Sequence, residues 1–102
     1  MYLIEIFLPT FDTLDQAFDK REFESVRAEL IEQFGGVTAF LRSPAVGLWK
    51  DDSGEIRQDD IAIFEVMTHA LDRDWWREYR HQLERRFRQQ EVVIRATEFE
   101  RL

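Results

Sequence analysis

Four short apolar segments and two segments of helical periodicity follow one another along the chain. The strand candidates are short and rich in β-branched and aromatic residues, and they are residues 2–8, 37–42, 61–68 and 91–99. We expect the second strand to resume at 46–49, ahead of a turn at 51–54. With a helix after the first and the third strand, the predicted order is β-α-β-β-α-β.

The first helix has clear start and stop signals. Asp19 is a good N-cap, and Glu22 follows three residues later, as in a capping box. Phe18 and Phe23 are placed to form a hydrophobic staple across this start. Gly35 ends the helix, because glycine tolerates the left-handed conformation. The predicted core face consists of Phe23, Val26, Leu30 and Phe34.

The second helix begins after the N-cap candidate Asp72 and carries many charges. Its predicted core face consists of Trp76, Tyr79, Leu83 and Phe87. Its basic outer face consists of Arg73, Arg77, Arg80, Arg85, Arg86 and Arg88. Because acids interleave with these arginines and Glu84 and Arg88 have the i,i+4 spacing of an ion pair, we interpret this face as solvated.

The element order predicts an α+β fold of the ferredoxin-like, split β-α-β type, in which residues 1–102 form a single domain. A four-stranded antiparallel sheet in the order 4-1-3-2 would carry two helices on one face and leave the other face open. Strands one and three, which are the most apolar, would lie in the centre.

The parity of each strand assigns side chains to the two faces, because successive residues alternate. Glu65 belongs on the open side, since an unpaired buried carboxylate is costly. The open face is then expected to include Leu3, Glu5, Phe7, Phe40, Arg42, Ile61, Ile63, Met67, Val93, Arg95 and Phe99. A monomer rarely exposes so large an apolar patch, so we expect a homodimer formed through this open sheet face.

Composition excludes several classes of protein. With 44% hydrophobic and 34% charged residues the chain is globular, and no apolar segment is long enough to span a membrane. The net charge of −7 disfavours nucleic acid as a partner. The absence of cysteine excludes disulfides and, together with an N-terminal stretch that does not read as a signal peptide, suggests a cytoplasmic protein.

Two acids on the open face are candidates for a catalytic role. Glu5 and Glu65 lie on the central strands and could form a carboxylate pair in which one pKa is raised. The alternative, which we favour, is cross-strand ion pairing of Glu5 with Arg95 and of Glu65 with Arg42.

The remaining candidates for chemistry are weaker. His69 ends the third strand near the rim of the sheet, where a general base would be accessible, although an ordinary surface histidine is the simpler interpretation. Trp75 would line a pocket between helix and sheet or pack at the edge of the core. Two distant histidines without cysteine predict no metal site, and no cofactor is expected.

The element order, over the whole chain, resembles the dimeric α+β barrel superfamily. The stretches Phe34-Gly35-Gly36-Val37-Thr38, Gly47-Leu48-Trp49 and Phe87-Arg88-Gln89 are similar to small uncharacterised bacterial proteins. The superfamily includes cofactor-independent monooxygenases, haem-degrading enzymes, isomerases and ligand-binding proteins, so the fold says little about function. The Asn, Trp and His set of the haem-degrading members does not carry over, because the chain has no Asn.

Three functional hypotheses remain from the sequence. The first is a homodimeric domain that binds or senses a small molecule. The second is a cofactor-independent monooxygenase or isomerase, with His69, Glu65 and Trp75 as pocket residues. The third is a structural or interaction module without a ligand.

Overall fold

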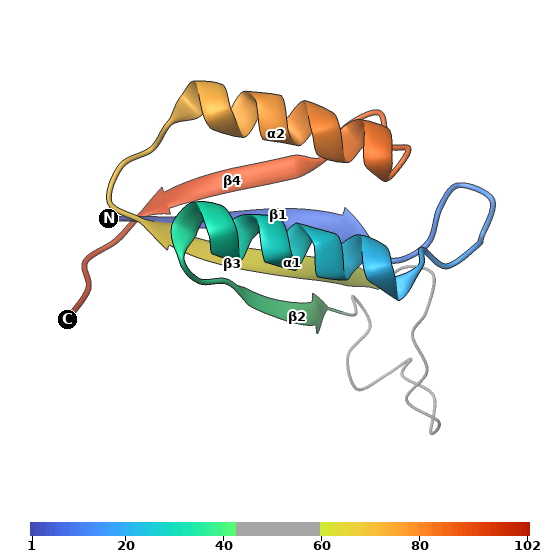
Figure 1. Cartoon of the computed structure of the whole chain (residues 1–102), viewed down its shortest axis with the longest axis horizontal. Coiled ribbons are helices and arrows are strands. Elements are labelled where there is room, and N and C mark those ends of the chain that lie inside the picture. Colours follow the sequence, from blue (N-terminus) through green and yellow to red (C-terminus); the bar gives the residue numbers. More distant parts are fainter. Residues whose placement is uncertain (43–59) are drawn as a thin grey trace.

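The computed structural model describes residues 1–42 and 60–102. Its elements are β1 (Tyr2–Pro9), α1 (Lys20–Phe34), β2 (Thr38–Arg42), β3 (Ile61–Thr68), α2 (Arg73–Arg86) and β4 (Val93–Glu98) (Figure 1). This order confirms the predicted α+β fold class. The expected continuation of strand two at 46–49, the turn at 51–54 and the stretch at 47–49 lie outside the described residues.

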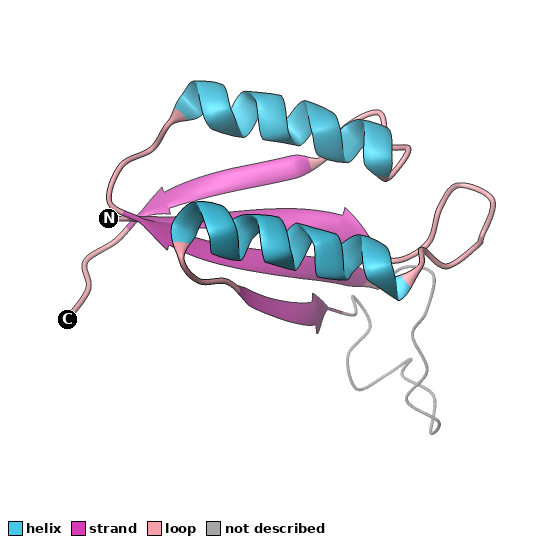
Figure 2. Ribbon diagram, viewed as in Figure 1, coloured by secondary structure: helices cyan, strands magenta, loops and turns pink. Residues whose placement is uncertain are grey.

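The four strands form one antiparallel sheet in the order β2-β3-β1-β4, as predicted. Both helices lie on the same face of this sheet (Figure 2). β1 and β3 are the central strands, while β2 and β4 are its two edges. The opposite face of the sheet is covered by no helix of the described chain.

α1 begins and ends at the residues that its caps predict. The Asp19 carboxylate accepts a hydrogen bond from the backbone N–H of Arg21 at 2.9 Å. Gly35 adopts a left-handed φ of 83° and donates its N–H to the Ile31 carbonyl at 2.7 Å. Val26 and Leu30 are fully buried, so the predicted face points into the core.

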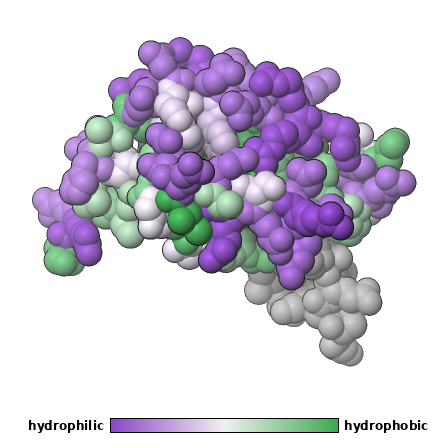
Figure 3. Space-filling view, viewed as in Figure 1, coloured by the Kyte–Doolittle hydropathy of each residue, from purple (hydrophilic) through white to green (hydrophobic). Residues whose placement is uncertain are grey.

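α2 begins in the same way. The Asp72 carboxylate accepts a hydrogen bond from the N–H of Trp75 at 3.1 Å. The predicted core face is buried in full, at Trp76, Tyr79, Leu83 and Phe87. The outward surface of the helix layer is mostly hydrophilic (Figure 3). Neither described helix has the length and apolarity needed to cross a membrane.

The hydrophobic core lies between the helices and one face of the sheet. Its strand residues are Ile4, Ile6, Leu8, Phe64 and Val66, which alternate with the residues expected on the open face. The rings of Phe18 and Phe23 both contact the ring of Phe87, at 5.0 and 5.4 Å between centroids. The start of α1 is thus packed onto the end of α2.

β4 is shorter than the predicted 91–99. The N–H of Val92 donates to the Glu84 carboxylate on α2 at 3.0 Å, so the pairing with β1 starts at Val93. Phe99, predicted as an open-face strand residue, follows the end of β4 and donates its N–H to the Met1 carbonyl at 2.9 Å.

Candidate functional site

A row of charged residues crosses the middle of the open face. The register pairs Glu5 on β1 with Glu65 on β3 and, on its other side, with Arg95 on β4. We call Glu65, Glu5 and Arg95 the acid row. Thr38 on β2 lies opposite Glu65 and extends this row to the other edge of the sheet.

Arg95 neutralises the central acid of the row. Its Nε donates to Oε1 of Glu5 at 2.8 Å, and the Glu5 side chain is only 13% exposed. The Arg95 guanidinium also lies 4.9 Å from the ring centroid of Phe7. The predicted ion pair between Glu5 and Arg95 is therefore present.

Glu65 has a different electrostatic environment. Desolvation raises the pKa of Glu65 above its ordinary value, and the charge of Glu5 and a hydrogen bond with the Glu5 carboxyl raise it further. Glu5 and Glu65 are thus a carboxylate pair in which the pKa of one member, Glu65, is raised.

The predicted ion pair between Glu65 and Arg42 is wrong, because these two residues do not lie opposite each other on β2 and β3. The backbone of Arg42 pairs with Ile61, whereas Glu65 pairs with Thr38 four residues earlier on β2. Parity places both residues on the same face, but it does not say how far the strands are shifted along each other.

An apolar row runs next to the acid row. It consists of Phe40, Ile63, Phe7 and Val93, which pair in that order across all four strands. Phe40 and Val93 at its two ends are 43% and 52% exposed, whereas Ile63 in the middle is 2% exposed. On the other side of the acid row Met67, which pairs with Leu3, is 57% exposed.

A hollow of about 590 Å³ lies where β1 begins and β3 ends. The side chains that matter for its chemistry are Leu3, Thr38, Glu65, Met67, His69 and Arg101. The structure therefore brings two of the candidate residues, Glu65 and His69, to one concave site. The glycine turn at 34–37, which carried part of the family resemblance, forms another wall of the same hollow.

Local structure explains how the hollow forms. The left-handed Gly35 ends α1 abruptly and turns the chain into β2. The bond from Phe99 to Met1 holds the C-terminal tail beside β1, which places Arg101 on the rim. Nothing in the sequence pattern points to Arg101, because its position depends on tail contacts rather than on periodicity.

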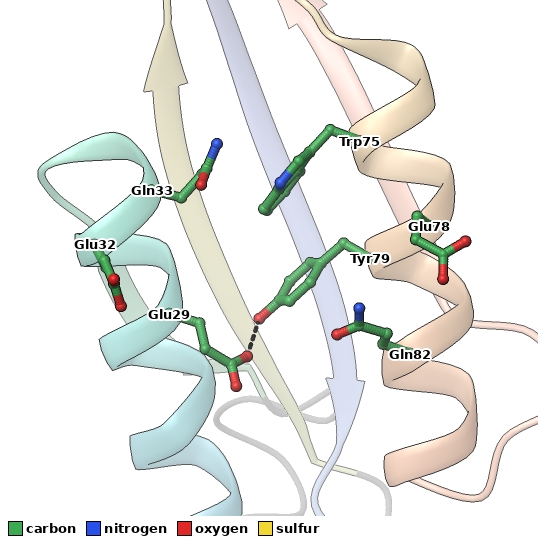
Figure 4. A pocket seen from close by; sticks show the side chains of 7 residues that line it. All are labelled: Glu29, Glu32, Gln33, Trp75, Glu78, Tyr79 and Gln82. Carbon is green, nitrogen blue, oxygen red and sulfur yellow. Dashed lines mark hydrogen bonds between the residues drawn. The ribbon is translucent and has the colours of Figure 1, made fainter.

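Trp75 does not reach this hollow. It lies on the helix side and lines a polar groove of about 310 Å³ between α1 and α2 (Figure 4). Its ring contacts the rings of Phe34, Trp76 and Tyr79, with centroids 4.8 to 5.1 Å apart. Trp75 is therefore part of an aromatic cluster that packs at the edge of the core.

Glu29 joins the two helices across this groove. It accepts a hydrogen bond from the Tyr79 hydroxyl at 2.7 Å and bonds from Arg86 at 2.7 and 3.0 Å (Figure 4 shows the tyrosine). Burial raises the pKa of Tyr79, and the neighbouring carboxylate of Glu29 raises it further. Tyr79 stays a neutral donor, so this cluster holds the helices together.

The described residues 1–42 and 60–102 contain no group of three His, Asp or Glu side chains placed to hold a metal ion.

Comparison with known proteins supports the fold alone. No protein-family model and no curated protein matches the chain. Among solved structures, it is similar to a phage SAM lyase in complex with S-methyl-5'-thioadenosine, with a TM-score of 0.62 and 11% sequence identity. The match covers 95% of this chain and 80% of that chain. The likeness agrees with a four-stranded antiparallel sheet carrying two helices.

Proposed function

We propose that this protein is a homodimeric small-molecule-binding domain of the dimeric α+β barrel type, and that its ligand occupies the hollow at the end of the open face. The observation that carries the proposal is the presence of Glu65 and His69 in one hollow, beside an apolar row that no described helix covers. The proposal treats residues 1–102 as one domain of a cytoplasmic protein.

The apolar row supports the second copy. Large exposed apolar patches mark interaction sites, and a two-fold axis lets one patch cover its equivalent. Phe40 and Val93 lie at opposite edges of the sheet and are both about half exposed. A second copy on this face would also cover the open side of the hollow, because Leu3, Glu65 and Met67 of the hollow lie on the same face of the sheet.

The lining supports a nucleoside-sized ligand. A volume of about 590 Å³ lies within the usual range for small-molecule sites. Leu3 and Met67 offer apolar contact to a flat ring, while Thr38, Glu65 and His69 offer hydrogen bonds to hydroxyl groups. S-methyl-5'-thioadenosine, which the similar phage enzyme holds, combines a flat aromatic ring system with a sugar that carries hydroxyl groups.

The experiment is a thermal-shift screen followed by titration calorimetry, with S-methyl-5'-thioadenosine as the first probe in a panel of nucleosides and metabolites. We expect a member of this class to raise the melting temperature of the wild-type protein. His69→Ala should weaken the binding about tenfold, as expected for the loss of one good polar contact. His81→Ala, which removes the other histidine outside the hollow, is the matched control.

Two results would contradict the proposal. Absence of stabilisation by every compound in the panel would favour the interaction module without a ligand. A monomeric mass in light scattering at micromolar concentration would remove the second copy.

The carboxyl pair favours one enzymatic alternative, a cofactor-independent monooxygenase or isomerase. Glu65, whose pKa is raised, and His69 line the same hollow, so they offer a general acid and a general base in one site. Turnover of a bound compound that Glu65→Gln abolishes, without loss of binding, would favour this alternative.

A further inference from the structure

Three arginines of α2, which are Arg73, Arg77 and Arg80, line a second groove of about 280 Å³ between α2 and the edge strand β4. Arg95 on β4 also borders this groove, but its side chain pairs with Glu5 on the open face. In a chain with a net charge of −7, this is a local concentration of positive charge.

The helix places its three arginines in a line. Spacings of four and three residues put Arg73, Arg77 and Arg80 on one stripe of α2. At a rise of about 1.5 Å per residue the stripe extends about 10 Å along the helix. It lies beside the buried core face, and its three arginines line the same groove as Ile94 and Ala96 of β4.

Two of the three helix arginines, Arg73 and Arg77, are available to a ligand. Among the residues that the structure describes, Arg73 has no ion pair or hydrogen bond. Arg77 contacts Asp74 at 3.0 Å, but the two side chains are 61% and 91% exposed, and such pairs contribute little. Arg80 and Arg95 are held by Glu84 and Glu5, whose side chains are only 14% and 13% exposed.

The floor of the groove is apolar. Trp76, at 6% exposure, Ile94 and Ala96 form its centre, and the last two residues belong to the helix side of β4. Because β4 is an edge strand, its outer side is open to an incoming molecule. A cationic rim over an apolar floor suits a molecule with an apolar body and an anionic end.

We propose that this groove binds a small phosphate ester with a flat apolar body. The body would lie on Trp76, Ile94 and Ala96, and the phosphate would be held between Arg73 and Arg77. Two guanidinium groups match a phosphate dianion in charge, and each can form paired hydrogen bonds to its oxygens. This site is separate from the open-face hollow, so a test of it is independent of the function proposed above.

The test uses the full chain and 1-naphthyl phosphate as the probe, measured by calorimetry and by tryptophan fluorescence because Trp76 lies in the floor. Arg73→Ala should weaken binding about tenfold, a typical effect of losing one charged contact. Arg85→Ala is the matched control, because it removes the same charge from α2 outside this groove. Ala96→Leu should also weaken binding, since it fills the floor without changing charge.

Ligand variants separate the two parts of the recognition. We expect 1-naphthol and inorganic phosphate each to bind far more weakly than the ester, 1-naphthoate to bind more weakly than the phosphate, and higher salt to weaken the ester. Equal losses of affinity for the ester in Arg73→Ala and Arg85→Ala would mean that the positive charge of α2 attracts the ester without a specific site. That result would overturn the proposal. Equal binding of 1-naphthol, or no binding of the ester at all, would also overturn it. Arg73 is unpaired, so its variant remains informative if Ala96→Leu does not fold.

Discussion

Glu5 and Glu65 lie opposite each other on the two central strands, and the guanidinium of Arg95 binds Glu5. One arginine thus serves a pair of carboxyl groups. Arg95 pairs with Glu5, whereas the pKa of Glu65 is raised, first by desolvation and then by the charge of Glu5. We therefore expect the stability of the protein to depend on the ionisation of Glu65.

Replacing Glu65 by Gln should stabilise the protein at neutral pH by about 0.5 kcal/mol, because it removes a like charge directly across the strands. A raised pKa in the folded state contributes stability below the ordinary glutamate pKa, and this contribution is lost as pH rises through the raised value. The extra stability of Glu65→Gln over the wild type should therefore disappear at acidic pH. Denaturant unfolding at acidic and at neutral pH measures this difference, with Glu98→Gln as the control on β4. A destabilised Glu65→Gln at neutral pH would contradict the assignment.

Replacing Arg95 by Gln should destabilise the protein at neutral pH, because Glu5 loses its partner while Glu65 remains. The loss should be smaller in a Glu65→Gln background. A double-mutant cycle measured by denaturant unfolding gives this coupling. Additive effects would show that Arg95 acts on Glu5 independently of Glu65.

Charged substitutions in the apolar row should convert the proposed dimer into a monomer. Val93→Asp places a charge at a position that is 52% exposed in one chain, so the fold itself should tolerate it. Light scattering is expected to report half of the wild-type mass. Leu14→Asp is the control, because Leu14 is 77% exposed and lies outside the sheet. The same loss of mass in Leu14→Asp would locate the contact elsewhere.

The two glycines beside the hollow should respond differently to alanine. Gly35 has a φ of 83°, so Gly35→Ala should destabilise the protein by about 1 to 2 kcal/mol. Gly36 has open space around its α-carbon and no left-handed φ, so Gly36→Ala should leave stability within about 0.5 kcal/mol of the wild type. Thermal unfolding of the pair checks this. A larger effect at Gly36 would mean that the turn is held by other contacts.

The ion pairs at the end of α2 differ from those that the sequence spacing predicts. The i,i+4 spacing predicted a pair between Glu84 and Arg88, but Glu84 contacts Arg80 at 3.2 Å and also accepts the N–H of Val92. Arg88 lies beyond the end of α2 with a φ of 52°, and it contacts Asp12 at 3.1 Å. Helical spacing applies only while the helix continues, and α2 ends at Arg86.

The sequence by itself determined the elements, their order and the buried face of each helix, because caps and apolar periodicity act within a few residues of the chain. Only the tertiary structure decided that Glu65 faces Glu5 and Thr38 rather than Arg42, and that His69 and Arg101 share its hollow. Register and the path of the tail depend on hydrogen bonds between residues far apart in the chain. No local pattern of side chains encodes those bonds.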